Sequence, residues 1–189
     1  MESLLISTGA VAISEIGDKT QLLALLLASR FRRPIPIILG IFVATVANHT
    51  LAALLGNWIG DAIAPELLRW ALGALFIGMA IWALVPDSVD REDAANLTAG
   101  GAFMVTTVSF FLAEIGDKTQ IATAALAAQF SAVLPVVIGT TVGMLIADVP
   151  AVLCGQIVGH RIDGRWVRLA AAVIFAILGL LILIGVKLV

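Results

Sequence analysis

The chain has 189 residues, of which 61% are hydrophobic and only 13% are charged, and its mean hydropathy is +1.10. These values exclude an ordinary soluble globular domain and indicate an integral membrane protein. The net charge of -2 gives no reason to expect a nucleic-acid partner, and the single cysteine, Cys154, excludes an internal disulfide.

Six apolar segments follow one another along the chain, each near or above the roughly 20 residues needed to span a bilayer. They cover residues 4–28, 35–58, 67–85, 98–128, 132–159 and 166–186. We therefore expect an all-α integral membrane protein with six transmembrane helices. The chain starts MESLL, without a basic region or a cleavage site, so the first segment is expected to be a retained helix rather than a signal peptide.

Arginines gather in every second connection between these segments. The connections after the first, third and fifth segments hold Arg30, Arg32, Arg33, Arg91, Arg161, Arg165 and Arg168, while Arg69 and Lys187 lie on the other side. The positive-inside rule places the arginine-rich connections in the cytoplasm. It therefore predicts that the N- and C-termini lie on the non-cytoplasmic side.

The two halves of the chain repeat each other when the sequence is shifted by 99 residues without a gap. EIGDKTQ at 15–21 returns at 114–120, and glycines, prolines and arginines match as well, including Pro36 with Pro135, Gly40 with Gly139 and Arg69 with Arg168. We predict two three-helix repeats, 1–85 and 98–189, joined by a cytoplasmic linker, 86–97. Because each repeat has an odd number of helices, the two must insert in opposite orientations.

Each copy of the motif places charges deep in an apolar segment, where a charged residue costs about 2.5–3.5 kcal/mol. If the backbone stays helical, Glu15 and Asp18 share one helix face. Gly17 and Gly116 can instead accompany local unwinding, or they can serve tight helix packing alone. For the glycines spaced four apart, Gly56 with Gly60, Gly139 with Gly143 and Gly155 with Gly159, packing is the preferred interpretation.

The motif residues offer mostly hard oxygen ligands, which suit Ca²⁺, Mn²⁺ or Mg²⁺. The expected metal ligands are Glu15, Asp18, Glu114 and Asp117, with Lys19, Thr20, Gln21, Lys118, Thr119 and Gln120 in supporting roles in metal or proton coupling. Four carboxylates against two lysines leave a formal charge of about -2, which one divalent cation or two protons would neutralise. A cation/proton antiporter follows this logic. The alternative is a set of buried salt bridges that only lock the halves together, although such bridges often add little stability over an apolar core.

His49 and Asp148 occupy equivalent positions in the two repeats. We expect Asp148 to be a further metal ligand, because a carboxylate at this depth is costly and Pro150 frees a backbone carbonyl nearby. His49, next to Asn48, could favour Mn²⁺ as a neutral imidazole or carry protons. A structural histidine, hydrogen-bonded to Asn48, Thr45 or a carbonyl group, is an equal alternative.

The doubled E-x-G-D-K-T, at Glu15–Thr20 and again at Glu114–Thr119, resembles the signature of the Gdt family, also called uncharacterised protein family sixteen. The resemblance covers essentially the whole chain. It implies a six-helix exchanger of Mn²⁺ or Ca²⁺ against H⁺, with metal and protons as substrates and no resident cofactor. The short linker resembles that of compact bacterial members, which implies a multi-pass protein of the inner membrane that exports manganese.

Three other classes of function stay open at this stage. A channel or uniporter would pass the metal without moving protons. An intramembrane aspartyl protease would need a GxGD pattern, but Glu15 and Glu114 stand where its first glycine belongs, so we do not expect an enzyme. An assembly factor would leave the charged motifs unexplained. Membrane lipid is an expected partner, and a homo-oligomer is compatible with the sequence.

Overall fold

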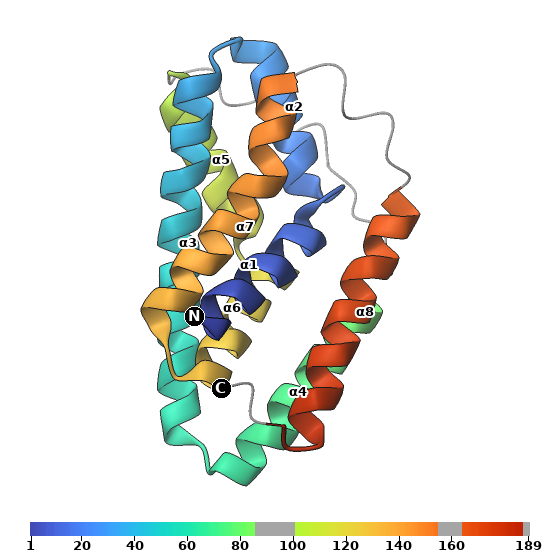
Figure 1. Cartoon of the computed structure of the whole chain (residues 1–189). Coiled ribbons are helices and arrows are strands. Elements are labelled where there is room, and N and C mark those ends of the chain that lie inside the picture. The colour runs from blue at the N-terminus through green and yellow to red at the C-terminus, as the bar shows by residue number, and fades with distance from the viewer. Residues whose placement is uncertain (86–100, 155–163, 187–189) are drawn as a thin grey trace.

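The computed structural model describes residues 1–85, 101–154 and 164–186, and these residues form helices joined by short turns (Figure 1). The expected all-α class is confirmed. The helices are α1 (Glu2–Glu15), α2 (Lys19–Phe31), α3 (Pro34–Ala62), α4 (Pro65–Trp82), α5 (Ala102–Glu114), α6 (Lys118–Phe130), α7 (Val133–Cys154) and α8 (Gly164–Leu183).

The first and fourth expected segments are each broken in two, which is why six apolar segments give eight described helices. The breaks fall inside the two copies of the motif, between α1 and α2 and between α5 and α6. The expected linker 86–97 lies outside the described residues, as do Gly155, Gly159, Arg91, Arg161 and Lys187.

Three described helices are long and apolar enough to cross a membrane: Pro34–Ala62, Pro65–Trp82 and Val133–Leu153. Ala102–Glu114 and Arg168–Leu183 are shorter apolar helices. Proline begins both α3 and α4, at a position where its missing N–H costs no helical hydrogen bond.

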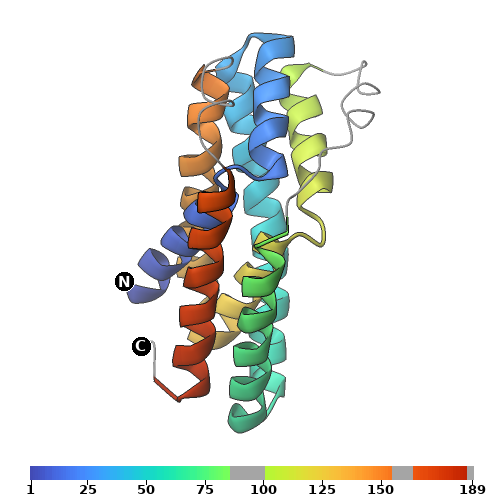
Figure 2. The same ribbon diagram turned by 90° about the vertical axis from the view of Figure 1, so that its right-hand side faces the viewer.

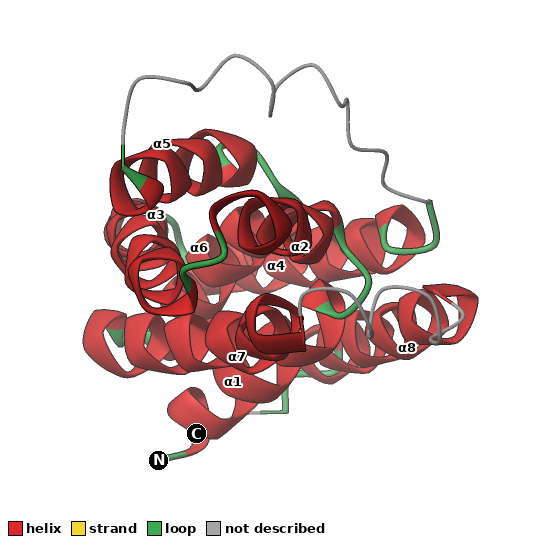
Figure 3. Ribbon diagram, turned by 90° about the horizontal axis from the view of Figure 1, so that it is seen from above, coloured by secondary structure: helices red, strands yellow, loops and turns green. Residues whose placement is uncertain are grey.

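Each broken helix packs mainly on the long helix of the other half. α1 and α2 pack on α7, α5 and α6 pack on α3, and α3 and α7 contact each other. In Figure 1, α1 and α2 run upward while α5 and α6 run downward. Figure 3, seen from above, places α3 and α5 on one side of the molecule and α1 and α7 on the other. This arrangement brings the two breaks to the middle of the molecule.

The buried apolar side chains form two separate clusters. The first core is built largely from α4, α6 and α8, with additions from α1, α3 and α7, and Phe76 and Phe175 are at its centre. The second core is built from α2, α3, α5 and α7. Neither α4 nor α8 contributes a described side chain to the second core. In Figures 1 and 2 this pair lies beside α1 and α6.

Several glycines serve close helix contact, as their spacing predicted. A Cβ atom on Gly139 would lie 2.5 Å from the Leu4 carbonyl oxygen, and one on Gly143 would lie 2.7 Å from that of Thr8. Gly56 and Gly60 approach the backbone of α6 in the same way. The packing interpretation is confirmed for these four positions, because real Cβ atoms would force the helices apart.

Candidate metal centre

The motif backbone leaves the helix at its glycine. Gly17 and Gly116 have φ angles of 79° and 75°, which glycine adopts readily and other residues rarely do. A Cβ on Gly116 would meet nothing within 4 Å, so conformation rather than close packing explains glycine there. The backbone does not stay helical through the motif, so the condition under which Glu15 and Asp18 would share one helical face is not met, and the structure has the local unwinding that the glycines allowed.

Each motif satisfies the backbone that its own break exposes. The Gly17 N–H donates to Gln21 Oε1 at 2.9 Å, and the Gly116 N–H donates to Gln120 Oε1 at 2.7 Å. The glutamine one turn further along each motif thus accepts a hydrogen bond from the N–H group at the break.

The two aspartates tie the halves together. Asp18 and Asp117 occupy the N-cap positions of α2 and α6, yet neither side chain caps its own helix. Lys118 Nζ instead lies 2.6 Å from Asp18 Oδ1, and Lys19 Nζ lies 2.9 Å from Asp117 Oδ1. Both contacts cross between the repeats. The salt bridges considered from the sequence thus exist, but only for the aspartates.

The two glutamates stay outside these salt bridges. Glu15 and Glu114 are completely buried, and each accepts a hydrogen bond from its own motif threonine, Thr20 at 2.5 Å and Thr119 at 2.9 Å. The second oxygen of each, Oε1, has no hydrogen-bond partner among the described residues. Two buried carboxylates therefore each present an oxygen that a cation could bind.

Three carboxylates converge closely enough to hold one ion. Glu15, Glu114 and Asp117 each offer an oxygen, and these oxygens lie within 4.8 Å of one another. Ligands on opposite sides of a Ca²⁺ ion are about 4.6–5.2 Å apart, given its bond lengths, and smaller cations need only slight closure. The cluster takes ligands from both repeats, so a cation bound there would bridge the halves.

The motif glutamines reach α3 and α7 at equivalent positions, one of which is the predicted Asn48. Gln21 Nε2 donates to the Ala147 carbonyl at 2.9 Å, and Gln120 Nε2 donates to Asn48 Oδ1 at 3.3 Å. Asn48 in turn donates to the Phe111 carbonyl at 2.9 Å. Positions 48 and 147 are equivalent in the two repeats, so each glutamine reaches the same place on the opposite half.

Neither Asp148 nor His49 belongs to the group of three converging side chains found among the described residues. Asp148 is completely buried, and neither of its oxygens has a hydrogen-bond partner among the described residues. His49 is equally buried, and neither ring nitrogen has such a partner in the part of the chain that is described. The hydrogen bond to Asn48 or Thr45 that would make it structural is thus not seen.

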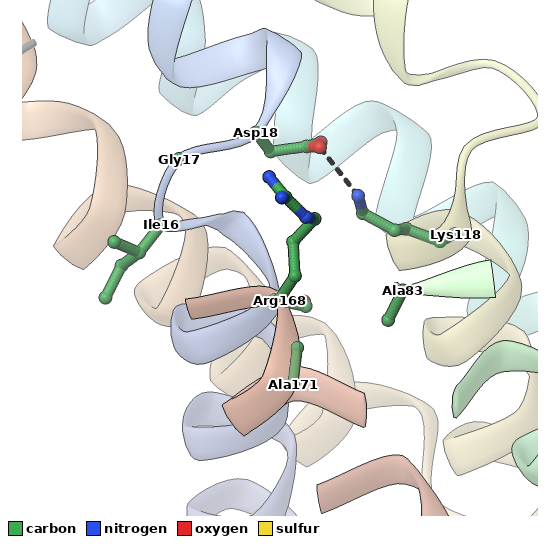
Figure 4. Close-up of a pocket in the computed structure, with 8 residues that line it drawn as sticks. Ile16, Gly17, Asp18, Ala83, Lys118, Arg168 and Ala171 are labelled. Atoms are coloured by element: carbon green, nitrogen blue, oxygen red, sulfur yellow. Dashed lines mark hydrogen bonds and ion pairs between the residues drawn. The ribbon is translucent and has the colours of Figure 1, made fainter. Parts of the chain in front are cut away.

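One residue beside the motif was not predicted. A pocket of about 30 Å³ adjoins the break of the first motif and is lined by Ser14, Ile16, Gly17, Asp18, Ala83, Lys118, Arg168 and Ala171. Arg168 points into it toward Asp18 (Figure 4). From the sequence, this arginine was assigned only to a cytoplasmic connection. Its match with Arg69 across the repeat is the sequence feature that could have marked it as a candidate site residue.

Two broken helices that bring buried carboxylates together are features typical of membrane transporters for cations. The chain is a member of the family described as "Divalent cation/proton antiporter GDT1", whose model matches residues 3–91 and 102–188. The predicted family resemblance is confirmed. This is a family of transporters and not of enzymes.

The curated relatives agree with this family. A Vibrio cholerae protein named "Putative manganese exporter" is 49% identical over 181 residues, covering 95% of this chain and 90% of its own length. "GDT1-like protein sll0615" of Synechocystis is 31% identical over 185 residues, covering 87% of this chain and 88% of its own. "GDT1-like protein 5" of Arabidopsis thaliana is 27% identical over 205 residues, covering 89% of each chain. No solved structure matches the chain.

Proposed function

We propose that this protein exchanges Mn²⁺ for protons and exports the metal from the cytoplasm of a bacterium, with Ca²⁺ as the alternative ion. The observation that carries the proposal is the group of Glu15, Glu114 and Asp117 oxygens within 4.8 Å of one another. The name of the Vibrio relative favours manganese and export.

The division of charge within the motif favours exchange over simple binding. Lys19 and Lys118 form salt bridges with Asp117 and Asp18. Their positive charges therefore balance the aspartates, and the negative charges of the glutamates have no lysine partner among the described residues. A buried pair of carboxylates without lysine partners must be neutralised by metal or by protons. Glu15 and Glu114 are therefore the groups proposed to alternate between a metal-bound and a protonated form, with Asp148 as an additional ligand.

The proposed membrane arrangement has six spans in two inverted repeats. α1 with α2 and α5 with α6 would be the broken spans, and α3, α4, α7 and α8 the continuous ones. The cluster would then lie near the middle of the bilayer, where broken helices commonly bind ions in such folds. Both termini are proposed to lie on the non-cytoplasmic side of the inner membrane.

The test is transport by protein reconstituted in liposomes, with metal flux and internal pH recorded together. Entry of Mn²⁺ should drive protons outward, and Glu15→Gln and Glu114→Gln should abolish both fluxes. Glu2→Gln, which removes an exposed carboxylate at the start of α1, is the matched control and should keep them. Metal movement without opposing protons would instead mean a channel or uniporter.

A further inference from the structure

The packing of α4 and α8 breaks a symmetry that the other helices keep. Repeat equivalence pairs α1 with α5, α2 with α6, α3 with α7, and α4 with α8. The contacts of α1 and α2 with α7 are matched by those of α5 and α6 with α3. α8 also packs on α1, and α4 packs on α6. Among the described residues, the equivalent pairs, α4 with α5 and α8 with α2, have no comparable packing.

The side chains that would make these equivalent contacts are exposed. Leu26 on α2 is 40% exposed, whereas its counterpart Ala125 on α6 is 3% exposed in the first core. Leu112 on α5 is 61% exposed, whereas its counterpart Ile13 on α1 packs against that core. The uncovered faces of α2 and α5 thus carry apolar side chains that could receive α4 and α8.

The equivalent arginines of α4 and α8 also have different surroundings. Arg168 on α8 points toward Asp18 at the break of the first motif (Figure 4). Arg69, its counterpart on α4, pairs instead with Glu66 at 2.6 Å, near the start of α4. Each motif aspartate has a lysine from the other repeat, but among the described residues only Asp18 also has an arginine beside it, because Arg69 is engaged by Glu66.

We propose that α4 and α8 form the gate of the transporter and that Arg168 and Arg69 take turns beside the motif. In the conformation seen here, α8 lies on α1, α4 lies on α6, and Arg168 stands beside Asp18 at the break of the first motif. In a second conformation, obtained by exchanging the repeats, α4 lies on α5, α8 lies on α2, and Arg69 stands beside Asp117. This inference rests on the proposed transport function.

Charge gives each arginine a reason to act at this place. A guanidinium beside a motif aspartate repels a cation that approaches from that side and adds positive charge to the motif when the metal has left. The uncovered faces belong to α2 and α5. Arg30, Arg32 and Arg33 lie at the end of α2, and the positive-inside rule places that end toward the cytoplasm. The conformation seen here therefore closes the non-cytoplasmic side.

Pairs of cysteines in a Cys154→Ala background test the exchange. Ser14 and Ala171 line one pocket, so cysteines there should cross-link through a short bifunctional thiol reagent in membranes. Their repeat counterparts are Ala113 and Leu72. These two now belong to different cores, since Leu72 is in the first and Ala113 packs against the second. Cross-linking of Leu72→Cys with Ala113→Cys therefore reports the second conformation.

We expect both pairs to cross-link, with the ratio of the two products changing when Mn²⁺ is added. Arg168→Gln should lower the Ser14–Ala171 product and raise the Leu72–Ala113 product, and Arg69→Gln should do the opposite. Ala74→Cys with Ala113→Cys uses an exposed face of α4 and is the control that should not react.

The gate is refuted if the Ser14–Ala171 pair reacts but the Leu72–Ala113 pair does not, with or without metal and in the Arg168→Gln background. Equal effects of the two arginine variants on both products would also refute it. Cross-linking needs no transport, so a protein that changes conformation but moves no protons would overturn the proposed exchange and leave the gate standing.

Discussion

Asp18→Asn and Asp117→Asn remove the same charge from the two copies of the motif, yet they should affect stability unequally. Asp18→Asn removes the charge opposite Lys118, whose side chain is only 4% exposed, while Asp117→Asn removes the charge opposite Lys19, whose side chain is 27% exposed. The Lys19 ammonium can move toward water on its flexible stem. Lys118 is too deeply buried to do so.

Breaking a buried ion pair typically costs 3–5 kcal/mol, and we expect about 3 kcal/mol for Asp18→Asn because the amide oxygen can still accept a hydrogen bond. We expect about 1 kcal/mol for Asp117→Asn, as for a partly exposed pair. At about 2–4 °C per kcal/mol for a chain of this size, the apparent melting temperature should fall by about 6–12 °C and about 2–4 °C.

Thermal unfolding of the purified protein in detergent, followed by tryptophan fluorescence, measures both shifts. Glu15→Gln is the matched control, because it removes a carboxylate with no lysine partner and should leave the melting temperature unchanged or raise it. Adding Lys118→Met to Asp18→Asn should restore most of the loss. Equal losses for Asp18→Asn and Asp117→Asn would refute the reasoning from burial.

Three further predictions concern other parts of the chain. Gly116→Ala should lower the free energy of unfolding by about 1–2 kcal/mol, because alanine is strained at a φ of 75°. Gly9→Ala, where a Cβ also meets open space, should raise it by about 0.5–1 kcal/mol inside α1. Equal changes in the two melting temperatures would contradict this. Asp148→Asn should reduce transport of every cation, and His49→Ala should mainly lower the preference for Mn²⁺ over Ca²⁺; competition assays decide, and an unchanged ratio in His49→Ala would make that histidine structural. For orientation, a cysteine at Glu2 should react with an impermeant thiol reagent outside intact cells and one at Ser88 should not; labelling of position 88 would overturn the topology.

The helices were predictable because apolar length and the 99-residue repeat are read directly from the sequence. The break in each motif was harder to predict. Gly17 allowed either a continuous helix or unwinding, and its positive φ accompanies the hydrogen bond to Gln21, a contact four residues away that spacing alone does not reveal. The repeat located the motif, but the local hydrogen bonding decided its shape.

The residues of the candidate site could be predicted from the sequence, but their pairing with one another could not. The sequence supplied four carboxylates and two lysines without saying which would pair. Cross-repeat geometry decides this, since Lys118 reaches Asp18 from the other half and the glutamates stay with their threonines. Arg168 was missed because its approach to the motif depends on how α8 packs on α1, a tertiary contact that the sequence pattern does not encode.

The reciprocal pairs between the halves impose an order on synthesis. Lys19 and Asp18 are made first, but their partners Asp117 and Lys118 follow only about a hundred residues later. At about 5–20 residues per second, the first motif waits roughly 5–20 s in the nascent chain. During that interval its charges have to remain hydrated or be held by the insertion machinery, because the hydrocarbon tails of the lipids offer them no partner. In the proposed six-span arrangement, the first broken span would therefore settle in the bilayer only once the second broken span has arrived.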